Sequence, residues 1–147
     1  MVKSYGFLAI DSDCTRQVIK HKLGANSGSF DSDEMLEEIG NEIDILSAYS
    51  SNIVVSHVIM PADIHKYINL FESKGMVYRI ILLRPNYETA LQRTKTRTCH
   101  TSTTPEEWVR YFYDRLIFRD VEILDNTNLT VEQSVHEIMK IYCDSPI

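Results

Sequence analysis

Short apolar runs alternate along this chain with segments in which apolar residues recur every three or four positions. The runs predict short strands buried on both faces, and the periodic segments predict amphipathic helices. Strands that alternate with helices are joined by crossovers, which makes neighbouring strands parallel. The predicted strands are 6–10, 53–55, 77–83 (the longest run, expected to be central) and 121–124. The sequence therefore predicts an α/β fold with three αβα layers and a mostly parallel sheet.

Helix starts are marked by side chains that can cap them. Two helices are expected to follow a single capping residue, Asp13 or Asn86, and one is expected to begin with Pro61 at its first position. Three more are expected at capping boxes: at 31–34, at 104–107 (where a proline takes the first position), and at Thr130 with Gln133. The helix that opens at 31–34 should be amphipathic, because its apolar residues recur at spacings of four and three: Met35, Ile39, Ile43 and Leu46. Trp108 and Phe112 lie one turn apart and are expected in the core.

Length and charge limit the classes of function. The chain, residues 1–147, is long enough for one domain with its own core. A formal net charge of −6 argues against broad affinity for nucleic acid or an anionic membrane surface, although a pocket for one nucleotide needs only local positive charge. The three cysteines are far apart and form no CxxC pair, which is typical of the reducing cytoplasm. No apolar run reaches the roughly 18 residues of a membrane span.

The first predicted strand leads directly into two carboxylates and an arginine. Asp11 is expected at the carboxyl end of the strand, where open α/β sheets bind their ligands. Asp13 is expected to cap the following helix, which places Arg16 one turn inside it. Two acids and a base at a strand end suit a phosphate or a magnesium-bound phosphate. The simpler interpretation is that Asp13 only caps the helix and that Arg16 is exposed beside it.

Three segments, in the right order, resemble the small P-loop kinases, a superfamily that includes nucleotide, gluconate, shikimate and polynucleotide kinases and zeta-toxin-like enzymes. Residues 11–16 resemble their substrate-site DxDxxR after the second strand. Residues 82–97 resemble their fourth strand, the following helix and the lid, and residues 124–132 resemble their last strand and adenine-side turn. The resemblance covers essentially the whole chain. It implies phosphoryl transfer from ATP, with Mg²⁺, to a nucleotide or a small hydroxylated acceptor.

On the acceptor side, the resemblance assigns roles to the residues that match the family's motif. Asp11 and Asp13 would orient and activate the acceptor hydroxyl, and Arg16 would bind the acceptor. Asp11 could also hold the magnesium ion through a water molecule. His57 follows the second predicted strand, where relatives often carry an acid, and could meet a substrate phosphate.

On the nucleotide side, the resemblance implies a basic lid at about 93–104. Arg93 and Arg97 would close on the triphosphate and neutralise the migrating phosphoryl group, and Asn126 would lie beside the nucleotide. The simpler interpretation of the two arginines is a solvated helix end that is stabilised by the helix dipole.

The phosphate-binding loop of these kinases is absent from the sequence. The pattern G-x-x-x-x-G-K-[ST] needs a glycine directly before a lysine, and none of the five glycines precedes one. The family's first strand, normally central, would lie before Met1. We therefore expect a kinase-like domain that is impaired or inactive by itself, or a non-catalytic nucleotide-binding or regulatory domain of the same fold. A partner chain or a second copy could fill the gap in the sheet.

The same opening stretch also resembles the haloacid-dehalogenase-like phosphatases. Residues 7–15 look like their hhhDxDx[TV] motif, in which Asp11 would be the nucleophile and Asp13 the general acid/base, both near magnesium. Residues 54–56 resemble their second motif, a serine that ends an apolar strand, and Lys74 could serve as their lysine. The last motif has one acid, Asp125, where that family has two, and residues 84–97 remain unexplained.

Overall fold

The computed structural model describes residues 6–24, 32–96 and 104–144. Its residues gather into two compact units, 1–76 and 77–147. Each unit contains parallel strands and helices. The predicted α/β class with parallel pairing is confirmed. The prediction that 1–147 form one domain stays a prediction.

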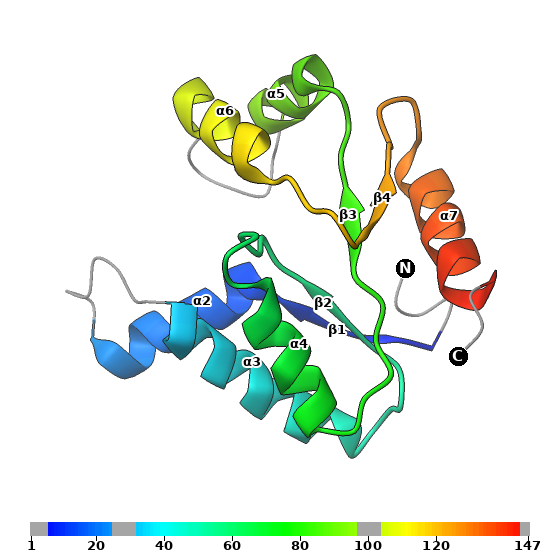
Figure 1. Cartoon of the computed structure of the whole chain (residues 1–147). Coiled ribbons are helices and arrows are strands. Elements are labelled where there is room, and N and C mark those ends of the chain that lie inside the picture. Colours follow the sequence, from blue (N-terminus) through cyan, green and yellow to red (C-terminus); the bar gives the residue numbers. More distant parts are fainter. Residues whose placement is uncertain (1–5, 25–31, 97–103, 145–147) are drawn as a thin grey trace. The chain divides into compact units, whose positions relative to one another are not determined.

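The first unit holds two strands and three helices. Its elements are β1 (Leu8–Asp11), α2 (Ser12–Leu23), α3 (Ser32–Ser47), β2 (Ile53–Ser56) and α4 (Ile64–Ser73). β1 and β2 pair in parallel, with Leu8 opposite Ile53 and Asp11 opposite Ser56. α3 contacts both strands and lies between α2 and α4 (Figure 1).

The core of this unit forms where α3 meets the strands and the other two helices. Its buried apolar side chains are Ile10, Ile19, Met35, Ile39, Ile43 and Tyr67. Three of them belong to the apolar stripe predicted for α3, and its fourth member, Leu46, is partly buried against this core, so the stripe is confirmed. α3 also approaches α4 closely, because an ideal Cβ on Gly40 would lie 3.2 Å from Cδ1 of Leu70.

Within its described residues, the second unit also has two strands and three helices. Its elements are β3 (Ile81–Leu83), α5 (Tyr87–Lys95), α6 (Glu106–Arg115), β4 (Glu122–Leu124) and α7 (Val131–Asp144). β3 and β4 pair in parallel, with Ile81 opposite Glu122 and Leu83 opposite Leu124. α5 packs against α6, the pair drawn in green and yellow in Figure 1.

The third strand is much shorter than its apolar run predicts. Residues 77–80 lie outside any strand, and the side chain of Val77 is 73% exposed. Within the described part of the chain, β3 pairs only with β4, so the central position predicted for it is not observed. An apolar run marks residues that can be buried, but hydrogen bonding to a neighbouring strand decides where the strand ends.

Two of the predicted helix starts are confirmed atom by atom. Oδ1 of Asn86 accepts a hydrogen bond from the backbone nitrogen of Thr89, at 2.9 Å. At the start of α7, the backbone nitrogen of Thr130 donates to Oε1 of Gln133 at 2.9 Å, and that of Gln133 donates to Oγ1 of Thr130 at 3.2 Å. This reciprocal pair is the predicted capping box.

Three other helix starts differ from the prediction. α2 begins two residues earlier, at Ser12, and Asp11, not Asp13, is its N-cap. Pro61 does not open α4: residues 61–63 form a turn closed by a 2.9 Å hydrogen bond from the nitrogen of Asp63 to the oxygen of Met60, and the helix begins at Ile64. Pro105 is itself the N-cap of α6, and no side chain caps that helix. Each of these helices begins within about three residues of its predicted start, but the residue predicted to cap or open it is wrong.

Candidate functional site

The carboxyl ends of β1 and β2 lie side by side in the first unit. Asp11 ends β1 directly opposite Ser56, which ends β2, and His57 follows. α2 starts at Ser12, so its first turn rises from the same edge. The residues predicted for the acceptor side therefore come from two adjacent strand ends and one helix start. This is the edge at which open α/β sheets bind ligands.

Asp11 has a structural role at this edge. Its backbone is extended (φ −102°, ψ 116°), and its Oδ1 accepts a hydrogen bond from the backbone nitrogen of Asp13, at 3.0 Å. An extended residue whose side chain bonds the nitrogen two positions on is the normal geometry of an N-cap. The Asp13 side chain is therefore not needed as the cap, and it lies exposed in the first turn of α2.

A pocket of about 170 Å³ opens beside the carboxyl end of β2. It is lined by Arg16, Ser32, Met35, His57, Val58, Ile59, Met60, Asp63 and Tyr67. It brings together Arg16 and His57, the two residues predicted to bind the acceptor. Asp11 and Asp13 do not line it. Ser32 and Tyr67, which reach the pocket from the first turns of α3 and α4, were not predicted as site residues, because no motif marks them.

His57 sits in this pocket as a neutral side chain. Its ring lies 5.5 Å from the ring of Tyr67, and its buried Nδ1 has no hydrogen-bond partner among the described residues. Burial lowers the pKa of His57 below its usual value, Arg16 lowers it further, and Asp13 raises it. At neutral pH the imidazole therefore adds no positive charge, so the positive charge that lines the pocket comes from Arg16.

Two further ionisable groups shape the pocket. Burial raises the pKa of Tyr67 to about 12, and the carboxylate of Asp63 adds to this effect, so the phenol stays protonated. Asp63 itself lies 3.4 Å from Nζ of Lys66, which also binds Asp33 at 2.6 Å. The negative charge at the α4 end of the pocket is therefore offset by a lysine.

In the second unit, Arg93 binds backbone carbonyl groups. Its Nη2 donates to the oxygen of Asn126 at 2.8 Å and lies 3.3 Å from that of Thr127 and 3.5 Å from that of Leu129. The guanidinium thus ties the last turn of α5 to the turn after β4. The predicted contact of Arg93 with a triphosphate stays a prediction.

Asn126 lies at the same turn, 9% exposed, and its Oδ1 is buried without a partner in the described part of the chain. The structure therefore brings Arg93 and Asn126 together, as the nucleotide-side prediction requires. Arg97 and the rest of the predicted lid up to residue 103 lie outside the described residues.

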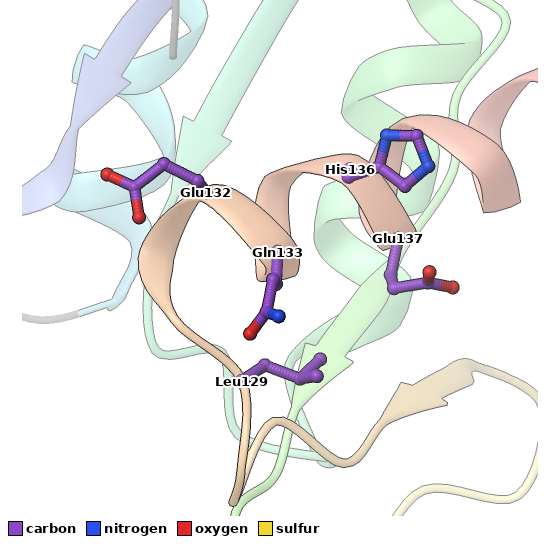
Figure 2. A pocket seen from close by; sticks show the side chains of 5 residues that line it. All are labelled: Leu129, Glu132, Gln133, His136 and Glu137. Carbon is purple, nitrogen blue, oxygen red and sulfur yellow. The ribbon is translucent and has the colours of Figure 1, made fainter.

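A second hollow, of about 320 Å³, opens on α7. Leu129, Glu132, Gln133, His136 and Glu137 line it (Figure 2). Figure 2 shows the carboxylates of Glu132 and Glu137 pointing away from each other, and Gln133 already serves the capping box. None of the predicted site residues lies here, and this arrangement gathers no groups for catalysis.

The described residues show neither a candidate metal centre nor a candidate membrane span. Among residues 6–24, 32–96 and 104–144, no three His, Cys, Asp or Glu side chains group closely enough to hold a metal ion between them. In the same ranges, no helix has both the length and the apolar character needed to cross a membrane. The predicted magnesium ion and cytoplasmic location stay predictions.

Comparison with known proteins bears on the fold. No protein-family model and no curated protein matches the sequence. The structure of the Deinococcus radiodurans tunicamycin resistance protein is similar to this chain, with a TM-score of 0.72 and 14% identity over 94% of this chain and 83% of that one. At this identity the likeness shows the fold alone, a distant kinase-like α/β fold, in agreement with the predicted αβα arrangement.

Proposed function

We propose that this chain is the acceptor-binding part of a phosphotransferase of the P-loop kinase type. The reaction would move the terminal phosphoryl group of ATP to a nucleotide or a small hydroxylated acceptor. The observation that carries the proposal is the pocket beside the carboxyl end of β2, in which Arg16 supplies a permanent cation beside the neutral His57. The kinase-like fold supports this interpretation.

Each side chain at this edge would have a separate task. Arg16 would bind a phosphate or carboxylate group of the acceptor, because its planar guanidinium can donate two parallel hydrogen bonds. Asp13 is exposed in the first turn of α2 and would orient the acceptor hydroxyl and take its proton. Asp11 would hold that turn in place through its bond to the Asp13 nitrogen.

Magnesium and ATP are implied by the resemblance. Mg²⁺ in kinase sites is commonly held by one or two carboxylates, with phosphate oxygens and water completing its shell. The exposed carboxylate of Asp11 fits this requirement and would hold the ion through a water molecule. When bound, the ion would neutralise charge on the phosphates. On the nucleotide side, Arg93 and Asn126 are the described residues that would lie near ATP.

The pocket can be tested without turnover. Isothermal titration with nucleoside monophosphates, sugar phosphates and small hydroxy acids should give at least one ligand, and Arg16→Ala should weaken it about tenfold or more. Lys20→Ala is the matched control, because Lys20 is an exposed cation one turn further along α2 and does not line the pocket. A ligand whose affinity is unchanged in Arg16→Ala would contradict the proposed pocket.

Turnover is a separate test. The sequence has no G-x-x-x-x-G-K-[ST] pattern, so we expect these 147 residues to transfer phosphoryl groups from ATP slowly or not at all. Rapid ATP-dependent phosphorylation of an acceptor by this chain would show that phosphate binding does not require that loop here. Ligand binding without turnover is the result we expect, and it is also what a non-catalytic regulatory domain would give.

One observation favours a second candidate, a haloacid-dehalogenase-like phosphatase. The strand register places Ser56 directly opposite Asp11, as that family's first two motifs require. Against it, the Asp11 carboxylate already caps α2. Hydrolysis of a generic phosphate ester with magnesium, lost in Asp11→Asn but kept in Arg16→Ala, would select this candidate over the kinase.

A further inference from the structure

α6 presents two opposite faces, and among the described residues of its unit only one of these faces packs against another helix. The hydroxyl of Tyr113 donates to the oxygen of Pro85 at 3.0 Å, and its ring lies 5.5 Å from that of Tyr87 at the start of α5. The guanidinium of Arg110 stacks on the Tyr87 ring, 4.6 Å from its centroid. These contacts fix the side of α6 that faces α5.

The other side of α6 is aromatic and exposed. Trp108, Tyr111 and Phe112 are 50%, 41% and 37% exposed. They follow the i, i+3, i+4 spacing that puts side chains on one face of a helix. The guanidinium of Arg115, one turn on, lies 3.8 Å from the centroid of the Tyr111 ring. We call these four residues the α6 aromatic face. The core position predicted for Trp108 and Phe112 is therefore wrong.

The geometry of the rings argues against a slot for a nucleobase. Tyr111 and Phe112 meet at 89° and Trp108 and Tyr111 at 67°, with centroids 5.5 and 5.7 Å apart. The third pair, Trp108 and Phe112, is tilted by 31° with centroids 6.2 Å apart. Two pairs are therefore packed edge to face and the third is not parallel, so no two ring faces are aligned for a planar base to stack between them. The net charge of −6 also disfavours nucleic acid. The face is suited to the side chains of another protein surface.

The charges along α6 indicate which surface that is. Glu107 lies four residues before Tyr111, and Arg115 lies four residues after it. If two α6 helices cross antiparallel at Tyr111, each Glu107 meets the Arg115 of the other copy. Antiparallel packing also opposes the two helix dipoles favourably. Asp114, next to Arg115, weakens this pairing in part, whereas a parallel pair would bring like charges together.

We propose that the α6 aromatic face binds the same face of a second copy of this chain, with the two helices antiparallel about a two-fold axis. Such an interface is self-complementary, as two-fold dimers require. One helix from each copy buries less than the roughly 1,600 Å² of a standard interface, so the dimer should be weak, with a dissociation constant of about 10–100 µM. This proposal does not depend on the proposed function.

Concentration-dependent association tests the proposal. Sedimentation velocity should show a monomer at low concentration and a dimer when the concentration exceeds the dissociation constant. Trp108 is the only tryptophan of the chain, so its emission should shift to the blue over the same range as the indole leaves water. A monomer at every concentration, or emission already blue-shifted in the monomer, would overturn the proposal, because the face would then be unpaired or covered by its own chain.

Charge reversal tests the orientation. Glu107→Arg and Arg115→Glu should each weaken self-association tenfold or more, since each places two like pairs at the interface. An equimolar mixture of the two variants should form a heterodimer, because every pair across the interface is then opposite in charge. Glu132→Arg, an exposed reversal on α7, is the matched control and should leave association unchanged. A mixture that associates no better than either variant alone would overturn the antiparallel arrangement.

Discussion

Oδ1 of Asp11 accepts a hydrogen bond from the backbone nitrogen of Asp13, at 3.0 Å. The first of the two aspartates therefore closes the start of α2, and the second presents its carboxylate at the surface. Because only Asp11 caps the helix, substitutions of Asp11 and of Asp13 should have different effects, although both residues are acidic and lie two positions apart. It also means that loss of function on changing Asp11 need not report on chemistry.

Replacing Asp11 should therefore cost stability. We expect Asp11→Ala to lower the free energy of unfolding by about 1 kcal/mol, since an N-cap is lost, and Asp11→Asn to cost only a few tenths because asparagine also caps. Asp13→Ala should cost less than Asp11→Ala, because it removes a favourable charge from the first turn but leaves the N-cap of α2 in place. Urea unfolding followed by circular dichroism measures all three. Equal losses for Asp11→Ala and Asp13→Ala would show that the cap is assigned wrongly.

His57 should make stability depend on pH. Burial and Arg16 hold its pKa below the ordinary value of 6.5, which the unfolded chain regains. Between these two values the unfolded state binds more protons than the folded state, so the free energy of unfolding falls as the pH drops below about 6.5 and levels off below the folded pKa. Urea unfolding at a series of pH values measures this slope, which His57→Gln should reduce.

The neighbours of His57 should move its pKa in opposite directions. Arg16→Gln should raise the pKa by removing a nearby positive charge, and Asp13→Asn should lower it further. Titration of the His57 ring protons by NMR measures both shifts, and Lys20→Gln serves as the control that leaves the pKa in place. If the pKa of His57 does not rise in Arg16→Gln, the guanidinium lies too far from the imidazole to affect its protonation.

The features that the sequence predicted correctly are local ones. The stripe of Met35, Ile39 and Ile43 needs only helical spacing, and the capping box of Thr130 and Gln133 needs only residues three apart. Parallel pairing of β1 with β2 followed from the alternation of strands and helices. In each case the evidence lies within one element or its connection to the next.

The features that the sequence missed depend on distant neighbours. The pocket combines Arg16, Ser32 and Tyr67 from three helices, and no periodicity predicts which of their faces meet. Trp108 and Phe112 have the spacing of a buried stripe, yet α5 packs against the other side of α6. An apolar stripe thus shows which residues can be buried together but not which surface covers them.

Gly40 should matter because α3 and α4 approach closely there. An alanine Cβ would lie 3.2 Å from Cδ1 of Leu70, closer than comfortable contact. Against that strain, alanine favours the helix over glycine by up to about 1 kcal/mol. We expect Gly40→Ala to lower the melting temperature in the native chain but to raise it in a Leu70→Ala background, where the contact is gone. Thermal unfolding of the four proteins in this cycle measures the coupling, and equal effects in both backgrounds would show that Leu70 is not the obstacle.

Arg93 should stabilise the second unit even when no nucleotide is present. Its guanidinium binds carbonyl oxygens of Asn126, Thr127 and Leu129, at 2.8 to 3.5 Å. Arg93→Ala should therefore lower the free energy of unfolding by about 1–2 kcal/mol, as expected for hydrogen bonds from a charged donor, and Arg93→Lys should restore part of this, because one ammonium group cannot reach all three oxygens. Lys95→Ala is the matched control: it removes a cation from the same last turn of α5 and so reproduces the loss of helix-dipole stabilisation without the carbonyl contacts. If Arg93→Ala and Lys95→Ala cost the same, the carbonyl contacts contribute nothing, and Arg93 would be left with the role in nucleotide binding that the resemblance implies.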